Sequence, residues 1–192
     1  MIKQLILTAA LATASTAALA EPLSYKIDPS HTNVIAQWNH FGFSNPTAHF
    51  GDADGTLVYD ADDVAASSVE VTLPLSGLSS YTAKFDQHLR SSDFFDAAAF
   101  PLATFESTRV EAVGEGKLKV TGNLTIRDVT RPVVLDVKLN KTGEGRGGAP
   151  KVGFDATTSF NRSEFGIAKF IPNVGDTIDI RISTEATGEA AE

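Results

Sequence analysis

The sequence contains no cysteine among its 192 residues. Disulfide cross-links, thiolate metal sites and thiol nucleophiles are therefore excluded, and a folded domain must rely on its buried core. Positive charge is also scarce, because 16 lysines and arginines oppose 24 aspartates and glutamates to give a formal net charge of −8. An acidic surface repels phosphate backbones and anionic headgroups, which argues against nucleic acid as a partner and against strong adsorption to anionic membranes.

Long apolar runs are missing except at the N-terminus. Lys3 precedes an apolar and small-residue run over Leu5–Leu19, which ends at the small-x-small site Ala18-Leu19-Ala20. This arrangement is typical of a cleaved secretory signal peptide, since the run is shorter than the roughly 20 residues that span a bilayer. We therefore expect residues 1–20 to be a signal peptide and residues 21–192 to form one periplasmic domain. No cysteine follows the site, so we expect no lipid attachment and no stable membrane anchor.

Most of the remaining sequence alternates apolar and polar residues with the period of two that half-buried β-strands require. Between Leu118 and Ile126, for example, apolar side chains and Gly122 occupy the even positions, whereas the odd positions are mainly polar. Stretches rich in Asp, Gly or Pro separate such runs, and the glycine-rich stretch 143–150 is predicted to be a long hairpin loop. Seven or eight antiparallel strands of this kind are typical of a β-sandwich or a closed barrel.

The 12 phenylalanines are numerous enough to line a barrel interior that side chains do not fill completely. Three of them, Phe94, Phe95 and Phe100, lie in the segment Asp86–Pro101, which follows neither the helical period nor strand alternation for long. We interpret this irregular segment as the wall or lid of an apolar cavity. If the chain is extended there, Phe94 and Phe95 point in opposite directions, and one faces a ligand while the other belongs to the core. Short helices are expected only within 81–89 and 96–99.

Four motifs resemble the YceI-like family of secreted lipid- and polyisoprenoid-binding proteins. In the family's order they are DPSHTNVIAQWNHFGFS at 28–44, DQHLRSSDFFD at 86–96 with the following FP pair, GNLTIRDVTRPV at 122–133, and NRSEFGI at 161–167 before a GD pair. The resemblance implies an all-β fold, namely an eight-stranded antiparallel lipocalin-like β-barrel with short helical insertions. It also implies export to the periplasm and a cavity that holds one long apolar chain. The sequence departs from the family's usual residues at Ala36, Ala48 and Phe85.

We expect the ligand to contact inward-facing strand residues and the aromatic residues of the irregular segment. The predicted ligand-binding residues are Val34, Ala36, Trp38, Phe43, Phe50, Phe94, Phe95, Phe100, Phe105, Leu124, Ile126, Phe154, Phe160, Phe165, Ile167 and Arg162. For any single phenylalanine, plain core packing is the alternative. Arg162 either meets a ligand headgroup or pairs with Asp93 or Asp96 and so holds the irregular segment in place.

The expected function is periplasmic binding of a polyisoprenoid, an isoprenoid quinone or a fatty-acid-like molecule, for transport, storage or sequestration. The alternative is a periplasmic enzyme acting on an isoprenoid or lipid, with Asp93, Asp96 and His88 as its acid–base group. No nucleophile elbow, zinc-protease motif, phosphate-binding loop or dinucleotide fingerprint accompanies these residues, so we expect neither catalysis nor a cofactor.

Metal binding and self-association are further alternatives. Successive histidines at 31, 40 and 49 are nine residues apart. In a continuous strand, residues at an odd separation point to opposite faces, so we expect no metal site. A homodimer and a module that pairs through a sheet edge stay open.

The first prediction concerns processing at the small-x-small site. The exported protein should begin at Glu21, and removal of Lys3 with the leader should change its formal net charge from −8 to −9. Intact-mass measurement of protein from a periplasmic extract checks this. A membrane-retained species that still contains Lys3 would contradict it.

Overall fold

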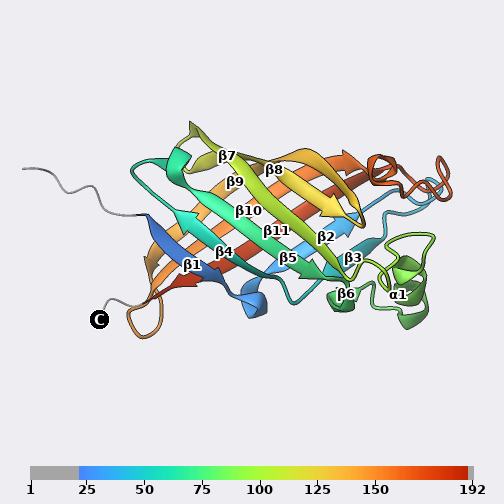
Figure 1. Cartoon of the computed structure of the whole chain (residues 1–192), viewed down its shortest axis with the longest axis horizontal. Coiled ribbons are helices and arrows are strands. Elements are labelled where there is room, and N and C mark those ends of the chain that lie inside the picture. The colour runs from blue at the N-terminus through green and yellow to red at the C-terminus, as the bar shows by residue number, and fades with distance from the viewer. Residues whose placement is uncertain (1–21, 190–192) are drawn as a thin grey trace, which may run out of the picture.

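The computed structural model describes residues 22–189, and the expected signal peptide lies outside this range. The strands of the described chain form one antiparallel sheet that closes on itself, because β1 (Leu23–Ile27) pairs with both β4 (Asp54–Tyr59) and β11 (Thr177–Gly188). Figure 1 shows the resulting elongated barrel. The prediction of an all-β, eight-stranded antiparallel barrel with short helical insertions is confirmed.

The first three of the eight barrel strands are each interrupted once. The first consists of β1 and β2 (Asn33–Gln37), the second of β3 (Thr47–Phe50) and β4, and the third of β5 (Ser68–Pro74) and β6 (Leu78–Ser79). The other five barrel strands are continuous. They are β7 (Leu102–Gly114), β8 (Lys117–Ile126), β9 (Val129–Glu144), β10 (Pro150–Asn161) and β11. The loop between β9 and β10 is the predicted hairpin loop.

Two of the interruptions lie against each other. The Gly51 N–H donates to the Gly77 carbonyl at 3.0 Å, and a Cβ added to Gly77 would lie only 2.5 Å from the Gly51 oxygen. Only glycine permits such an approach. Beyond this point β6 pairs with β3, whereas β7 pairs with β5 as far as Leu102 opposite Pro74. The third and fourth barrel strands therefore separate at one end, where residues 80–101 connect them.

The connecting segment contains α1 (Ala83–Arg90), which confirms the helix expected within 81–89. Residues 96–99 form a single turn instead of the expected helix, with the Asp96 carbonyl accepting from the N–H groups of Ala99 and Phe100. Pro101 disfavours the helical conformation at the preceding residue, which leaves room for that turn alone. The described part of the chain contains no helix with the length and apolarity that crossing a bilayer requires.

Gly122 gives the second prediction, because its missing side chain leaves room for the Phe105 ring. A Cβ at Gly122 would lie 2.3 Å from Cζ of Phe105 and 2.6 Å from the Glu106 oxygen. Gly122→Ala should therefore lower the free energy of unfolding by about 1–3 kcal/mol, measured by urea denaturation. Gly153→Ala is the matched control in β10, since its Cβ would make only an ordinary 3.6 Å contact. Equal midpoints for the two variants would contradict the prediction.

Candidate functional site

The barrel encloses a cavity of about 610 Å³. Its lining runs the length of the interior, from Tyr59 and Leu118 near one end to Phe94 and Phe170 at the other. The cavity falls within the range of roughly 300–1,000 Å³ that is typical of small-molecule sites. Inward-facing side chains therefore do not fill this barrel.

The inward face of β11 shows this incomplete filling directly. Ile178, Ile180 and Ile182 point into the barrel and line the cavity, yet each is only partly buried. Small residues such as Ala36 in β2 and Ala156 in β10 face the same space and leave it open. The strand alternation therefore yields an apolar, hollow interior.

Few polar groups face the cavity, and two of them, Thr32 and Thr184, are already hydrogen-bonded. Thr32 Oγ1 lies 2.8 Å from both the Asp28 carbonyl oxygen and Thr184 Oγ1. Both threonines line the cavity. The interior can therefore bind hydrocarbon by burial but offers little polar recognition.

The cavity has its mouth at the end beside α1. We define the mouth by four exposed lining residues whose side chains carry aromatic or imidazole rings, namely His40, Phe41, His88 and Phe170. His40 and Phe41 come from the loop between β2 and β3, His88 from α1 and Phe170 from the loop before β11. The rings of His88 and Phe170 lie 6.3 Å apart between centroids. Segments distant in sequence thus frame one opening.

Most of the predicted ligand-binding residues line the cavity. They are Val34, Ala36, Trp38, Phe50, Phe94, Phe95, Phe105, Leu124, Ile126, Phe154, Phe160, Ile167 and Arg162. Three predicted residues do not. Phe43 is 92% exposed at the loop tip beyond β2, where strand parity no longer applies, and Phe165 is fully buried against Phe160. Phe100 instead packs beneath the Arg127 guanidinium at 5.8 Å.

The prediction that Phe94 and Phe95 face opposite ways is wrong, because both line the cavity. The backbone turns there instead of extending, with the Phe94 N–H donating to Ser91 and the Phe95 N–H to Leu89. Phe94 then lies edge-on to His88 at 4.9 Å, and Phe95 lies edge-on to Phe50 at 5.7 Å. The interpretation of the irregular segment as a cavity wall is supported by these contacts.

Several lining residues were not among the predicted set. Leu135, Val137 and the three isoleucines of β11 belong to this group, although their strand alternation was visible in the sequence. Phe85 also lines the cavity, and its ring centroid lies 6.1 Å from that of Trp38. Phe170 follows the last motif and had no pattern to mark it.

Arg90 attaches α1 to the interruption between β5 and β6. Its guanidinium donates to the carbonyl of Leu75 at 2.8 Å, to that of Ser76 at 3.0 Å and also to that of Leu78. The carbonyls of Leu75 and Ser76 belong to the interruption, and that of Leu78 belongs to the first residue of β6. The arginine therefore completes the hydrogen bonding of the separated strands and fixes the helix over them.

Arg162 performs the same task for the loop before β11, and it is buried, with 6% exposure. Its guanidinium donates to four carbonyl oxygens at 2.8–3.0 Å, those of Ile167, Lys169, Val174 and Gly175. Burial lowers the pKa of this guanidinium from its usual value, and nearby Asp176 opposes that shift. The side chain fixes the loop that contains Phe170.

The predicted pairing of Arg162 with Asp93 or Asp96 is wrong. The Asp93 carboxylate instead lies 3.3 Å from the Lys169 ammonium, and both side chains are about half exposed. The N–H groups of Arg162 donate to carbonyls of its own loop, so they do not bond a carboxylate of the irregular segment. The irregular segment and the loop are thus linked by a surface ion pair, which contributes at most about 1 kcal/mol.

The candidate acid–base group is not assembled as a unit. The His88 ring packs among Phe85, Phe94 and Phe170, while Asp93 pairs with Lys169. Within residues 22–189, no hydrogen bond joins His88 to Asp93 or Asp96. The arrangement offers an aromatic environment at the mouth rather than a proton-transfer pair.

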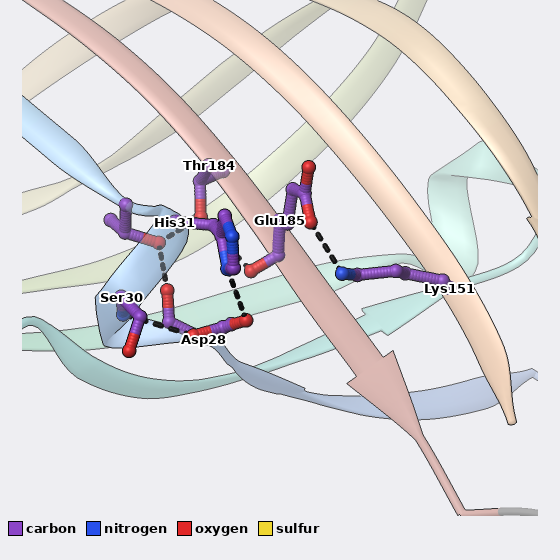
Figure 2. Close-up of polar contacts among 7 residues, drawn as sticks. Asp28, Ser30, His31, Lys151, Thr184 and Glu185 are labelled. Atoms are coloured by element: carbon purple, nitrogen blue, oxygen red, sulfur yellow. Dashed lines mark hydrogen bonds and ion pairs between the residues drawn. The ribbon is translucent and has the colours of Figure 1, made fainter. Parts of the chain in front are cut away.

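A cluster of potential metal ligands lies on the barrel wall near η1 (Pro29–His31), drawn in Figure 2. Ligand atoms of Asp28, His31 and Glu185 lie within 4.8 Å of one another. The His31 Nδ1 lies 2.7 Å from the Asp28 carboxylate, and this hydrogen bond holds the pKa of Asp28 below its usual value. Lys151 pairs with the Glu185 carboxylate and lowers the pKa of Glu185. Sequence spacing missed this cluster because Glu185 comes from the distant strand β11.

These contacts form an ion-pair network that joins η1 to the last two strands. The Asp28 N–H also donates to the Glu185 carbonyl at 2.9 Å. Lys151 already neutralises one of the two carboxylates, and His31 hydrogen-bonds the other. The network therefore helps to close the barrel where β1 meets β11.

Comparison with known proteins agrees with this geometry. Residues 25–186 match the YceI-like domain. A UPF0312 protein of Pseudomonas putida strain W619 is 37% identical over 188 residues, covering 96% of this chain and 97% of the relative. A UPF0312 protein of Enterobacter sp. strain 638 is 37% identical over 172 residues, covering 88% of this chain and 89% of the relative.

Solved structures share the barrel. The Campylobacter jejuni YceI protein superposes with a TM-score of 0.72 at 29% identity, covering 79% of this chain and 90% of the other. A domain from Saccharophagus degradans, described as polyisoprenoid binding, superposes with a TM-score of 0.67 at 12% identity, covering 87% and 99%, and so supports the fold alone.

Replacement of Arg162 provides the third prediction. Arg162→Met removes the donors of four carbonyls, and each buried carbonyl left without a partner costs about 1–3 kcal/mol, so the free energy of unfolding should fall by about 3 kcal/mol or more. Arg162→Lys keeps the charge but loses the planar set of donors, so its free energy of unfolding should lie between those of the wild type and Arg162→Met. Arg181→Met, on the exposed face of β11, is the matched control and should change stability by less than about 0.5 kcal/mol. Urea denaturation measures all three, and an Arg162→Met midpoint equal to that of the control would refute the assignment.

Proposed function

The chain belongs to the YceI-like domain family, and we propose that it binds one long-chain apolar molecule inside its barrel. The observation that supports this most directly is the apolar cavity of about 610 Å³ along the barrel interior. Partly buried inward-facing isoleucines would gain burial from such a ligand. The protein is proposed to act in the periplasm after removal of residues 1–20.

The lining favours recognition by length and shape. Burial of hydrocarbon stabilises a complex by about 0.8 kcal/mol per CH₂ group, without any specific polar contact. Arg162 lines the cavity but already donates to four carbonyls, so it is a poor candidate for pairing with an anionic headgroup. A polyisoprenoid, an isoprenoid quinone or a fatty-acid-like chain all meet these conditions, with any polar end at the mouth beside His40 and His88.

Release of the ligand in unchanged form fits the site better than catalysis. His88 contacts aromatic rings, and the Asp93 carboxylate pairs with Lys169. Transport, storage or sequestration requires only binding and release. Incubation of the protein with its extracted ligand should therefore yield no converted product.

Filling the cavity tests the proposal, as the fourth prediction. Protein purified without detergent should contain one apolar chain, detected by native mass spectrometry and lipid extraction. Ile180→Trp adds a large ring on the inner face of β11 and should abolish this occupancy, because the added volume enters the cavity. Ser183→Trp adds the same ring to the exposed face of that strand and should retain it.

Two outcomes count against the proposal. One is wild-type protein with no bound lipid and no thermal shift on addition of polyprenyl phosphate, quinone or fatty acid. The other is equal occupancy of the Ile180→Trp and Ser183→Trp variants.

A further inference from the structure

Exposed aromatic side chains gather at one end of the barrel. In residues 22–189 the large aromatic side chains that are exposed are Phe41 (50%), Phe43 (92%), Tyr81 (79%) and Phe170 (48%). We call these four residues the aromatic rim. They come from the β2–β3 loop, the segment before α1 and the loop before β11. These segments lie together at the end of the barrel opposite to where β1 begins and β11 ends (Figure 1).

The rim surrounds the route into the cavity. Phe41 and Phe170 line both the mouth and the cavity, while Phe43 and Tyr81 lie outside the lining. A large ring that is 92% exposed, as Phe43 is, gains nothing from the hydrophobic effect in the isolated protein. A cluster of such rings around an opening indicates a surface that is covered during function.

The backbone holds these rings outward. The Phe41 N–H donates to the Asn173 carbonyl at 2.7 Å, and the Gly175 N–H donates to Asn39 at 2.8 Å, so the two rim loops are tied together. Arg162 in turn fixes the second loop from inside. The rim is therefore part of a hydrogen-bonded framework.

Three rim residues occupy the left-handed region, with φ of 55° at Phe41, 61° at Tyr81 and 65° at Phe170. This conformation is unfavourable for a bulky side chain and persists only where the surroundings impose it. Replacement by glycine or asparagine would relieve the strain. Exposed aromatics at three strained positions indicate a function that requires these rings.

Charge at this end is balanced, unlike in the whole chain. The rim loops, residues 38–46 and 166–175, contain one formally charged side chain, Lys169, and residues 80–100 add Lys84 and Arg90 against Asp86, Asp93 and Asp96. Three positive charges therefore meet three negative ones, whereas the chain carries −8. The acidic excess lies elsewhere, so the rim can approach a neutral surface without repulsion.

We propose that the aromatic rim docks on a zwitterionic lipid bilayer, with its rings in the headgroup region and the mouth toward the hydrocarbon. Tyrosine is enriched at this interface, and phenylalanine is typical of the apolar faces that are buried at the boundary between headgroups and acyl chains. A charge-balanced end suits neutral lipids better than anionic ones. A bilayer also supplies the class of molecule that the cavity fits, so the ligand can enter without crossing water. This inference rests on the proposed function, because it takes from it that a long-chain apolar molecule passes between the bilayer and the cavity.

Co-sedimentation with sucrose-loaded phosphatidylcholine vesicles tests the docking. Exported wild-type protein should sediment with the vesicles at low and at high sodium chloride, since ring burial is insensitive to screening. The double variant Phe43→Ser/Tyr81→Asn removes two rings outside the cavity, and asparagine tolerates the backbone at 81. Its partition coefficient should fall by roughly tenfold or more, given the usual gain from burying one phenylalanine.

Matched and independent measurements separate docking from ligand binding. The control Leu23→Ser/Val113→Ser removes two half-exposed apolar side chains (50% and 53%), where β1 begins and where β7 ends, at the end of the barrel away from the rim (Figure 1). It should sediment as the wild type does. Uptake of N-phenyl-1-naphthylamine by delipidated protein without vesicles reports the cavity alone. It should be unchanged in the rim variant, which also confirms that this variant is folded. Should that variant unfold, Phe43→Ser alone, at an ordinary backbone position, gives the same comparison.

Several results would overturn the docking proposal. They are no sedimentation of the wild type, sedimentation only with anionic vesicles and only at low salt, equal loss in both double variants, or a wild-type dimer that the rim substitutions dissociate. Wild-type protein that sediments but, after removal of any bound lipid, takes up no naphthylamine probe would support docking while contradicting the proposed function.

Discussion

Hydrogen bonds from two arginine side chains to main-chain carbonyls hold the mouth of this barrel in place. Sheet pairing satisfies backbone groups along the closed part of the barrel, but it ends where the third and fourth barrel strands separate. Arg90 supplies donors to the interruption between β5 and β6, and Arg162 supplies them to the loop before β11. Without these donors, the segments that frame the cavity would lose the contacts that position them.

The use of carbonyls as partners has a consequence for the cavity. An arginine paired with a carboxylate would introduce a compact polar pair at the mouth, whereas the guanidinium of Arg162 is spread over four carbonyls and buried. The apolar lining therefore continues past it to Phe170 and Val174. Close approach of Gly51 and Gly77 contributes in the same way, because it joins two strand interruptions without placing a side chain between them.

Strand patterning was predictable from the sequence, and loop geometry was not. Alternation assigned Val34, Leu124 and Phe154 to the interior because a closed antiparallel register leaves each side chain one of two faces. The same argument failed for Phe43, which lies beyond the end of β2, and for the neighbours Phe94 and Phe95, where the backbone turns. The partners of Arg162 were unpredictable for another reason. Every residue has a main-chain carbonyl, so the sequence does not indicate which carbonyls an arginine bonds, whereas it does show the carboxylates.

The hollow interior also bears on how long the folded protein survives. A chain without disulfides, whose inward isoleucines are only partly covered, lacks part of the core that a barrel of this size can form. Any molecule that occupies the space binds only the folded state and raises its stability, by about 2.7 kcal/mol when its concentration is 100 times its dissociation constant. Local opening, and with it proteolysis, then becomes rarer in the filled barrel than in the empty one. The abundance of the protein would thus follow the supply of any such molecule, without a dedicated regulatory element.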